Sequence, residues 1–299
     1  MHIEMDGISV IIPTLNRENY ISSTISMLER QMIGVPFEII VVDQSDVLNI
    51  ELDNLAQKKD CLKYYYIENF RGLPEARNFG VSKSLYDFIL FLDDDINIDS
   101  DILVEHLKYL NNPEIGVVAG GITEKNRQNI DVCRVGYFDY FRALPFRGYH
   151  MDKNGYVDHA GGGNYSIKKS VFLQVGGVDE YLNYGAALHE ETEICLRVKE
   201  RGFKIFFNYK AHITHLAAET GGCSISNIRK YVESLVHNKA LVISRHLKWY
   251  QKPFAILYLF KVVTSFVLNN KDLSLYSIFM KAYIEGSKKG ELLPLNTFL

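Results

Sequence analysis

Four short apolar segments in the first hundred residues constrain the fold of this chain most strongly. They are rich in Ile, Val, Tyr and Phe and lack an alternation of polar and apolar residues; they are Ile8–Ile12, Phe37–Val42, Lys63–Ile67 and Phe88–Leu92. Strands that are buried on both faces of a parallel sheet have this composition. Because helical patterns separate the segments, we predict an α/β sandwich with a mainly parallel central sheet.

Three helices are predicted with defined starts or ends. The first follows a cap expected at Asn16 and carries apolar residues at three- and four-residue spacing; these are Ile21, Ile25, Leu28 and Met32. Pro74 suits the first turn of a second helix that contains Ala76 and Arg77. A third helix is expected from about Glu190 to Arg201, where Gly202 ends it.

Polar residues follow each of the four predicted strands. The segments are 13–17, 43–46, 68–72 and 93–95. In an α/β sheet the carboxyl ends of parallel strands share one edge, and ligands bind in the crevice there. These four segments are therefore expected to line one ligand site.

Three consecutive aspartates, Asp93, Asp94 and Asp95, end the fourth predicted strand. Such a cluster repels itself unless a cation binds, and carboxylate oxygens suit Mg²⁺ or Mn²⁺. The alternative is a solvated acidic turn that caps the next helix at Asp99 or Ser100. The expected position beside arginines favours a site for a metal and a diphosphate.

The last quarter of the chain differs in charge from the rest. Residues 1–222 hold 22 basic and 32 acidic side chains, whereas residues 223–299 hold 11 basic and 4 acidic ones. We therefore expect a catalytic domain over 1–222 and a basic, amphipathic helical region over 223–299. The net charge of −10 in the first part argues against nucleic acid as a partner.

A cytoplasmic location is expected from two observations. The acidic N-terminus carries no signal-peptide pattern, and the longest apolar run, Phe254 to Leu268, is shorter than the about 20 residues that span a bilayer. The four cysteines lack CxxC spacing and are predicted to be reduced thiols; they are Cys61, Cys133, Cys195 and Cys223.

Seven motifs, taken in order, resemble those of the family 2 glycosyltransferases. They are IIPTLNR, VVDQSD, ENFRGLPEARNFG, FLDDD, GGGNYSIKKS, GGVDE and HEETEICLR, and they cover roughly residues 8 to 222. The resemblance implies the GT-A fold and transfer of a sugar, with inversion at the anomeric centre, from a nucleotide donor that we expect to be a UDP- or dTDP-sugar.

The resemblance also implies roles for individual residues on the donor side. The base and ribose would be held by Pro13, Thr14, Arg17 and Asp43. Asn69, Arg71 and Arg77 belong to the segment expected to face the diphosphate. Asp93 and Asp94 would lie on the nucleotide side, whereas Asp95 would ligate the metal, with His215 as a second ligand. Gln44 departs from the family's usual acidic residue, which leaves the preference for a base open.

The acceptor side is implied by two further motifs. Glu191 matches the family's catalytic acidic position, and the first turn of a helix favours an ionised carboxylate there. Glu190 remains the alternative base. Gly162, Gly163 and Asn164 would lie beside the donor sugar, where glycine lets the backbone approach a ligand closely. Two alternatives need no catalytic role. The glycines could form a connecting loop, and the glutamates could be acidic residues that favour the start of a helix.

Two other functions use comparable folds. A nucleotidyltransferase would be expected to carry a glycine-rich phosphate loop after the first strand, which residues 13–17 do not provide. A carbohydrate-binding protein without activity would not need the aspartates and Glu191. The predicted function is transfer of one sugar to a glycan or lipid-linked glycan in assembly of a bacterial-type surface polysaccharide.

The basic C-terminal region has two interpretations. Trp249 and Tyr250, beside the apolar run, are side chains that favour a membrane interface. The region would then hold the enzyme on the cytoplasmic face of an anionic membrane. Alternatively, its helices pack on the catalytic domain or on a second copy of the chain in a homo-oligomer.

Overall fold

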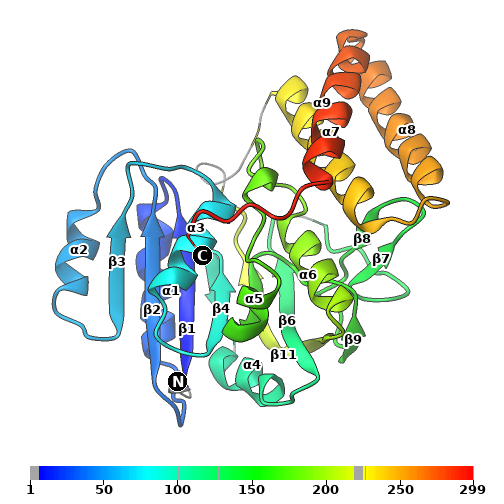
Figure 1. Ribbon diagram of the computed structural model, residues 1–299. Coiled ribbons are helices and arrows are strands. Elements are labelled where there is room, and N and C mark those ends of the chain that lie inside the picture. Colours follow the sequence, from blue (N-terminus) through cyan, green and yellow to red (C-terminus); the bar gives the residue numbers. More distant parts are fainter. Residues whose placement is uncertain (1–6, 100, 127, 219–224, 226, 299) are drawn as a thin grey trace.

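The computed structural model describes residues 7–99, 101–126, 128–218, 225 and 227–298. The fold is a large mixed sheet covered by helices, with three further helices at the C-terminus (Figure 1). Ser100 and Cys223, for which a helix cap and a free thiol were predicted, lie outside the described residues, as does the expected boundary at residues 222 and 223.

The first half of the sheet is parallel. Its four strands run in the order β3-β2-β1-β4, and their bounds are β1 (Ile8–Thr14), β2 (Phe37–Asp43), β3 (Leu62–Tyr66) and β4 (Phe88–Leu92). These strands match the four predicted apolar segments to within two residues at each end. Every residue of β1 except Pro13 is buried, as expected for a strand covered on both faces.

The second half of the sheet is mixed. It contains β10 (Asn164–Lys168), β6 (Ile115–Glu124), β11 (Lys204–His215), β5 (Ile96–Ile98) and β9 (Gly155–Val157). Strand β10 lies antiparallel between β4 and β6, whereas β6 and β11 are parallel. The last three residues of β11, Ile213 to His215, pair with β6 on one edge and with β5 on the other. Because β5 follows directly after the aspartates that end β4, the C-terminal end of β11 lies close to them. A separate ribbon is formed by β7 (Tyr137–Asp139) and β8 (Leu144–Phe146).

Six α-helices and one 3₁₀ turn accompany the sheet. They are α1 (Glu18–Glu29), α2 (Ile50–Ala56), α3 (Leu73–Lys83), α4 (Ile102–Leu110), α5 (Lys169–Gln174), η1 (Glu180–Leu182) and α6 (Glu190–Glu200). The predicted second and third helices are confirmed, with Pro74 in the first turn of α3 and a left-handed Gly202 after α6. The inner faces of the helices and both faces of the sheet form one apolar core.

The first helix differs from its prediction at both ends. Asn16 is not the cap: it has a left-handed φ of 55°, and its side chain donates to Asp46 instead. Asn tolerates this backbone conformation better than most residues do. Met32 lies beyond the end of α1 and is 89% exposed, so it does not continue the apolar face.

The C-terminal helices form a unit beside the sheet. They are α7 (Ile228–His246), α8 (Lys252–Asn270) and α9 (Ser274–Gly290). Helices α7 and α9 cross closely, because a Cβ at Gly286 would lie 2.1 Å from the carbonyl oxygen of His237. From α9 the chain returns along the front of the molecule to α3, where the ring of Phe298 packs against Phe70 and Phe79 (Figure 1).

Helix α8 is longer than the apolar run in the sequence suggested. At 19 residues it is, by length and composition, the one helix among the described residues that could cross a membrane. One face is buried in the helical unit through Ala255, Leu259, Val263 and Val267. The opposite face is exposed and apolar, with Phe254 at 59% and Leu257 at 66%.

Candidate functional site

A cavity of about 890 Å³ lies at the carboxyl ends of β1 and β4. Seven of the predicted site residues line it: Pro13, Thr14, Arg17, Arg71, Asp93, Asp94 and His215. They come from the ends of three strands and from the segment before α3, so the expected crevice is present. The rest of the wall includes residues of strand ends and of the segment before α6; they are Leu15, Gln44, Gly72, Leu73, Arg147, Asn183, Gly185, Ala186, Leu188, Ile225 and Tyr231.

Asp93, Asp95 and His215 form one cluster at this cavity. One potential ligand atom from each residue lies within 4.8 Å of the others. His215 Nε2 lies 3.2 Å from Asp95 Oδ1 and 3.8 Å from Asp93 Oδ2, while its Nδ1 lies 2.7 Å from Glu124 Oε2. The end of β11 thus places an imidazole against the aspartates that follow β4. Two carboxylates and an imidazole are a donor set for a divalent cation.

Asp94 belongs to a separate contact within the same turn. Its carboxylate accepts a hydrogen bond from the Thr14 hydroxyl at 2.6 Å and from the Arg17 guanidinium at 2.9 Å. Arg17 also lies 3.2 Å from Asp95 Oδ1. Arg17 therefore partly neutralises the aspartates, in addition to lining the cavity.

The electrostatics of this cluster vary from residue to residue. Burial raises the pKa of Asp94 to about 6, although Arg17 and Thr14 oppose the change. For Asp95, burial is outweighed by His215, the Ala218 amide and Arg17, and the pKa is lowered. Burial disfavours a charged His215, yet its hydrogen bonds to Asp95 and Glu124 raise its pKa to about 10.

Two residues predicted for the nucleotide pocket do not line the cavity. Asp43 is buried, and its carboxylate already accepts from the Tyr64 hydroxyl at 2.7 Å and the Ser45 amide at 2.8 Å. Gln44 lies on the cavity wall beside it. Asn69 is exposed on the surface and is absent from the cavity wall. After β2 the cavity is thus lined by Gln44 and not by the expected Asp43, whereas the segment after β3 contributes the expected Arg71 but not Asn69.

The two arginines expected at the diphosphate differ in environment. Arg71 lines the cavity, is about half exposed and pairs with Asp46 at 2.6 Å. Arg77 is 1% exposed: its guanidinium pairs with Glu190 and donates to the Gly162 carbonyl at 2.6 Å. Arg77 also lies 5.5 Å from the centres of two aromatic rings, those of Phe91 and Tyr165. A guanidinium that contacts a phosphate directly must be exposed to the cavity, and that of Arg77 is not. Its contacts hold Gly162 and Glu190 instead.

The glycine-rich segment lies between the aspartates and α6. A Cβ at Gly163 would fall 2.3 Å from Asp93 Oδ2, so only glycine leaves room for that carboxylate. A Cβ at Gly162 would lie 3.6 Å from both Glu190 and Glu191. Neither glycine lines the cavity. Asn164 was expected beside the donor sugar, but it is fully buried, bonded to Gly121, Ala211 and His106.

The three glutamates in the first turn of α6 have three different environments. Glu190 is buried against Arg77, and Glu193 is buried among Arg197, Arg245 and His246. Glu191 is partly exposed, and within the described part of the chain its carboxylate has neither a hydrogen bond nor an ion pair. Glu191 does not line the cavity itself. Its carboxyl carbon lies next to Gly162, 3.6 Å from the position of a Cβ built there. It is the one glutamate of the three that could accept a proton without first losing a partner.

Several cavity residues were not predicted. Arg147 lines the cavity, although nothing in its sequence surroundings separates it from a surface arginine. Residues 183–188 and Tyr231 come from segments without a motif. The one available signal was Gly185, which has a left-handed φ of 66° in a turn just before α6.

Comparisons with known proteins identify the family to which the sequence is similar. The sequence model described as Glycosyl transferase family 2 matches residues 9–172, more than half of the chain. A glucosyl-dolichyl phosphate glucuronosyltransferase of Haloferax volcanii is 26% identical over 220 residues, covering 70% of this chain and 68% of that protein. A poly-beta-1,6-N-acetyl-D-glucosamine synthase of Staphylococcus aureus is 24% identical over 226 residues. That match covers 73% of this chain, which spans about half the length of the synthase (52%).

Solved structures show the same fold. TarS residues 1–349 of S. aureus, in complex with UDP-GlcNAc, gives a TM-score of 0.64 at 17% identity, covering 94% of this chain and 81% of that one. GalNAc-T7 with UDP, GalNAc and Mn²⁺ gives 0.60 at 17% identity, covering 78% and 48%. Both are glycosyltransferases of the GT-A type. The fold, the ordered motifs and the match to the family together show that this chain belongs to glycosyl transferase family 2 and is a glycosyltransferase.

Proposed function

We propose that this enzyme transfers a single sugar from a nucleoside diphosphate sugar to a hydroxyl of a glycan or lipid-linked glycan, with inversion at the anomeric carbon. The observation that carries the proposal is the pairing of a cation site with a carboxylate that has no partner among the residues that the structure describes. Asp93, Asp95 and His215 form the cation site, and Glu191 lies across Gly162 and Gly163 from it. Inverting transfer needs those two functions on opposite sides of the sugar.

The donor diphosphate is held at the aspartate end of the cavity. A divalent cation ligated by Asp93, Asp95 and His215 would stabilise the negative charge that develops on the leaving diphosphate. Arg71 and Arg147 line the same cavity and supply positive charge to its phosphates. Arg17 and Thr14 fix Asp94, so that the turn holds its shape around the donor.

The acceptor hydroxyl is activated by Glu191. Its carboxylate takes the hydroxyl proton as the oxygen attacks the anomeric carbon from the side opposite the diphosphate. Glu190 is paired with Arg77. This ion pair and the hydrogen bond from Arg77 to the Gly162 carbonyl fix the glycine segment that lies between the base and the metal site. We therefore assign Arg77 and Glu190 a positioning role.

We further propose Mn²⁺ and a UDP-sugar. An imidazole ligand suits Mn²⁺ better than it suits Mg²⁺, which prefers oxygen ligands and water. GalNAc-T7 was solved with UDP and Mn²⁺, and TarS with UDP-GlcNAc. A dTDP-sugar is the alternative, because Asp43, expected to contact the base, is engaged with Tyr64 and Ser45.

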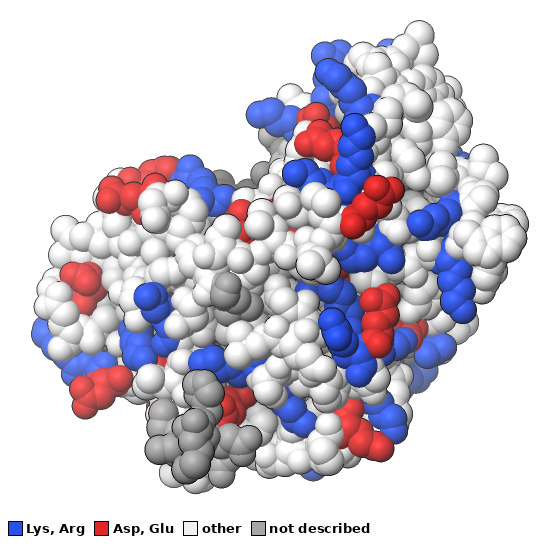
Figure 2. All heavy atoms as spheres, viewed as in Figure 1, with Lys and Arg blue, Asp and Glu red and all other residues white. Residues whose placement is uncertain are grey.

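A lipid-linked acceptor on the cytoplasmic face of a membrane fits the helical unit. The outer face of α8 exposes Phe254, Leu257 and Phe260, and Trp249 before it is 83% exposed. Figure 2 shows mostly uncharged atoms over α8 and Lys and Arg atoms gathered over the neighbouring α9. Apolar side chains flanked by cations favour an anionic lipid surface. The relative from Haloferax volcanii is named for a dolichyl phosphate substrate. The alternative occupant of this face is a second copy of the chain.

A panel of nucleotide sugars, assayed for transfer and for slow donor hydrolysis with Mn²⁺, tests the reaction. We expect one UDP-sugar to be consumed by the wild type. Glu191→Gln keeps the shape of the side chain but cannot take a proton, so kcat should fall by about 10² to 10⁴-fold while the donor KM changes little. Glu190→Gln is the matched control, and it should lower thermal stability more than Glu191→Gln does because Arg77 loses its buried partner. Loss of turnover in Glu190→Gln alone would make Glu190 the base.

A further inference from the structure

The loop of residues 183–189, here called the base loop, enters α6 in a conformation that needs external support. It lies between η1 and α6, has no regular structure and lines the cavity. Three of its residues have left-handed φ values: Gly185 at 66°, Ala187 at 48° and His189 at 71°. Ala and His adopt this region at a cost, so surrounding contacts must hold them there. Because Glu190 and Glu191 follow directly, the position of the base depends on this loop.

Helix α7 provides that support from the N-terminal side of the glutamates. The fully buried Asn238 donates through Nδ2 to the carbonyl of Leu182, the residue just before the loop, and to that of Leu188 near the end of the loop, each at 2.9 Å. One turn earlier, the buried Ser234 hydroxyl donates to the Tyr184 carbonyl and lies 3.3 Å from the Ala186 amide, which donates to it. The Asn238 amide therefore joins the two ends of the loop, while Ser234 holds its middle.

Aromatic contacts extend the same interface. The ring of Tyr184 stacks on that of His237 with the centres 4.2 Å apart, and the Tyr184 hydroxyl donates to Glu233. At its N-terminal end the helix also supplies Tyr231 to the cavity wall. One face of α7 is therefore built from polar and aromatic side chains that contact the base loop, whereas a helix that only packs on a domain needs apolar ones.

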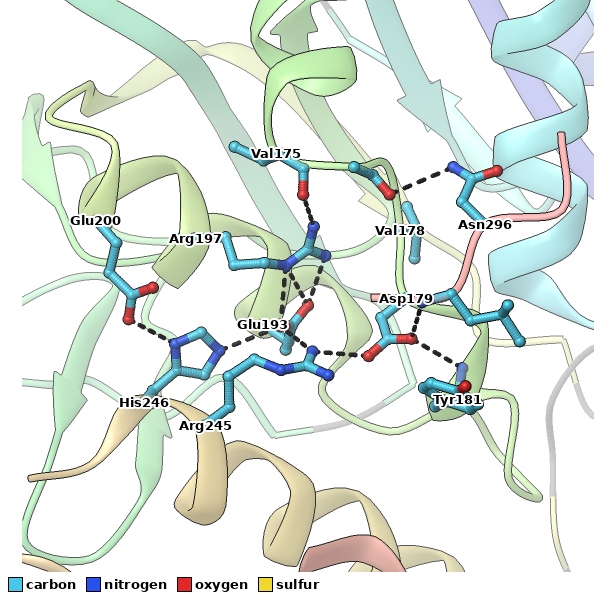
Figure 3. Close-up of polar contacts among 12 residues, drawn as sticks. Val175, Val178, Asp179, Tyr181, Glu193, Arg197, Glu200, Arg245, His246 and Asn296 are labelled. Carbon is cyan, nitrogen blue, oxygen red and sulfur yellow. Dashed lines mark hydrogen bonds and ion pairs between the residues drawn. The ribbon is translucent and has the colours of Figure 1, made fainter. Parts of the chain in front are cut away.

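The end of α7 anchors the other side of the glutamates. Figure 3 shows Arg245 and His246 directed at Glu193, together with Arg197 of α6. Arg245 lies 2.7 Å from Glu193 and 2.7 Å from Asp179, and His246 lies 3.1 Å from Glu193. Glu193 lies two residues after Glu191, within the first turn of α6. Both flanks of Glu190 and Glu191 are thus fixed by α7.

We propose that α7 is a positioning element of this enzyme: Asn238 and Ser234 set the base loop, and Arg245 and His246 set the first turn of α6, so that Glu191 faces the acceptor. The proposal rests on the proposed function of Glu191 as the base. A displacement of about 1 Å at a catalytic group can cost about 10² in rate, so loss of one anchor should affect turnover strongly.

Asn238→Ala and the isosteric Asn238→Asp test this role, because both remove the donating amide. We expect kcat to fall about 10- to 100-fold in each, with Mn²⁺ affinity within twofold of the wild type, because the cation ligands belong to the ends of β4 and β11. Hydrogen exchange should quicken at amides of residues 182–193 while those of β1 and β4 stay protected. Asn270→Ala, which removes an exposed amide bonded within α8, is the matched control and should behave as the wild type.

Two results would overturn the proposal. One is a wild-type kcat with unchanged exchange at residues 182–193 in both Asn238 variants. The other is a loss of turnover matched by loss of Mn²⁺ binding and of protection across the sheet, which would make Asn238 a residue of general stability. If the Asn238 variants do not fold, Ser234→Ala must show a smaller loss of kcat and faster exchange at residues 182–193, with unchanged Mn²⁺ affinity. A wild-type kcat in Ser234→Ala would contradict the role of α7. The exchange measurement needs no substrate, so it still decides the point if no donor is turned over and the proposed function fails.

Discussion

Two charged clusters lie within this molecule, and they differ in how their charge is balanced. At the cavity, four carboxylates, those of Asp93, Asp94, Asp95 and Glu124, face Arg17 and His215. Between α6 and α7, three carboxylates face three cations, and the residues are Asp179, Glu193, Glu200, Arg197, Arg245 and His246. The first cluster is acidic in excess and open to the cavity; the second is balanced and mostly buried.

This difference separates a ligand site from a structural one. An excess of carboxylates at the end of a strand is unfavourable until a cation binds, so we interpret the cavity cluster as the ligand site of the proposed function. Buried charges that already have partners gain nothing from a ligand, and their value is in fixing the elements that carry them. The following predictions test this distinction, beginning with the largest effect.

Removing the cation site should have the greatest effect on activity. With EDTA, or in Asp95→Ala, transfer should fall by at least about 10³-fold, because several kcal/mol of stabilisation of the leaving group are lost. Without metal, Asp95→Ala should also lower thermal stability, because Arg17, His215 and the Ala218 amide lose their contact with a buried carboxylate. If Asp95→Ala still transferred sugar without metal, the cavity cluster would not be a cation site, and its proposed difference from the balanced cluster would be wrong.

Breaking the balanced cluster should lower stability, and turnover with it, but should leave the cation site intact. Arg245→Leu leaves Glu193 and Asp179 with one partner fewer, and unpairing a buried charge costs about 3–5 kcal/mol. Chemical denaturation measures the loss. Mn²⁺ binding should remain, because none of the cation ligands contacts Arg245. A variant as stable as the wild type would show that this cluster is not structural.

His246 adds a dependence on pH to the balanced cluster. Burial opposes its charge, but hydrogen bonds to Glu193 and Glu200 raise its pKa above the ordinary value of 6.5; Arg197 and Arg245 also face Glu193. The stability that protonation adds is fully present below pH 6.5 and is lost as pH rises through the raised pKa. His246→Gln should therefore cost about 1–3 kcal/mol at pH 6 and less at pH 9, as measured by denaturation at both values. An equal cost at the two values would exclude a charged His246.

The smallest effect of a single substitution is expected for membrane association, measured as the free energy of binding to liposomes. Each basic side chain near an anionic surface contributes about 1 kcal/mol, so binding to liposomes that contain anionic lipid should weaken as salt is added. Leu257→Ser with Phe260→Ser, on the exposed face of α8, should reduce flotation, whereas Leu173→Ser, at an exposed apolar residue of α5, should not. A wild type that does not float at low salt would favour a second copy of the chain on this face.

The sequence predicted the sheet better than the site. The strands β1 to β4 were visible because buried strands need continuous apolar residues, and the aspartates after β4 stood out by their charge. Asp43 and Asn164 could not be placed in the same way, because a sequence does not show whether a polar side chain is satisfied inside the protein. For Asn69, the sequence does not show that the side chain lies on the surface, away from the cavity. Asn164 in particular bonds to residues that are between 43 and 58 positions away.

The balanced cluster was hidden for the same reason. Arg245 and Glu193 lie 52 positions apart, and Asn238 lies 50 positions from Leu188. In the sequence, Arg245 is one of many basic residues in the last quarter, and that quarter was interpreted from its charge and from the apolar and aromatic residues of one segment. Only packing of α7 on α6 shows that some of these cations are internal partners, whereas others remain on the surface.

Mn²⁺ titration of three proteins tests the central distinction most directly, using calorimetry or the loss of the free-ion electron paramagnetic resonance signal. The account predicts one ion bound per chain by the wild type and by Arg245→Leu, and none by Asp95→Ala. Binding that survives in Asp95→Ala, or that is lost in Arg245→Leu while the fold is retained, would contradict the assignment of the cavity cluster as the cation site.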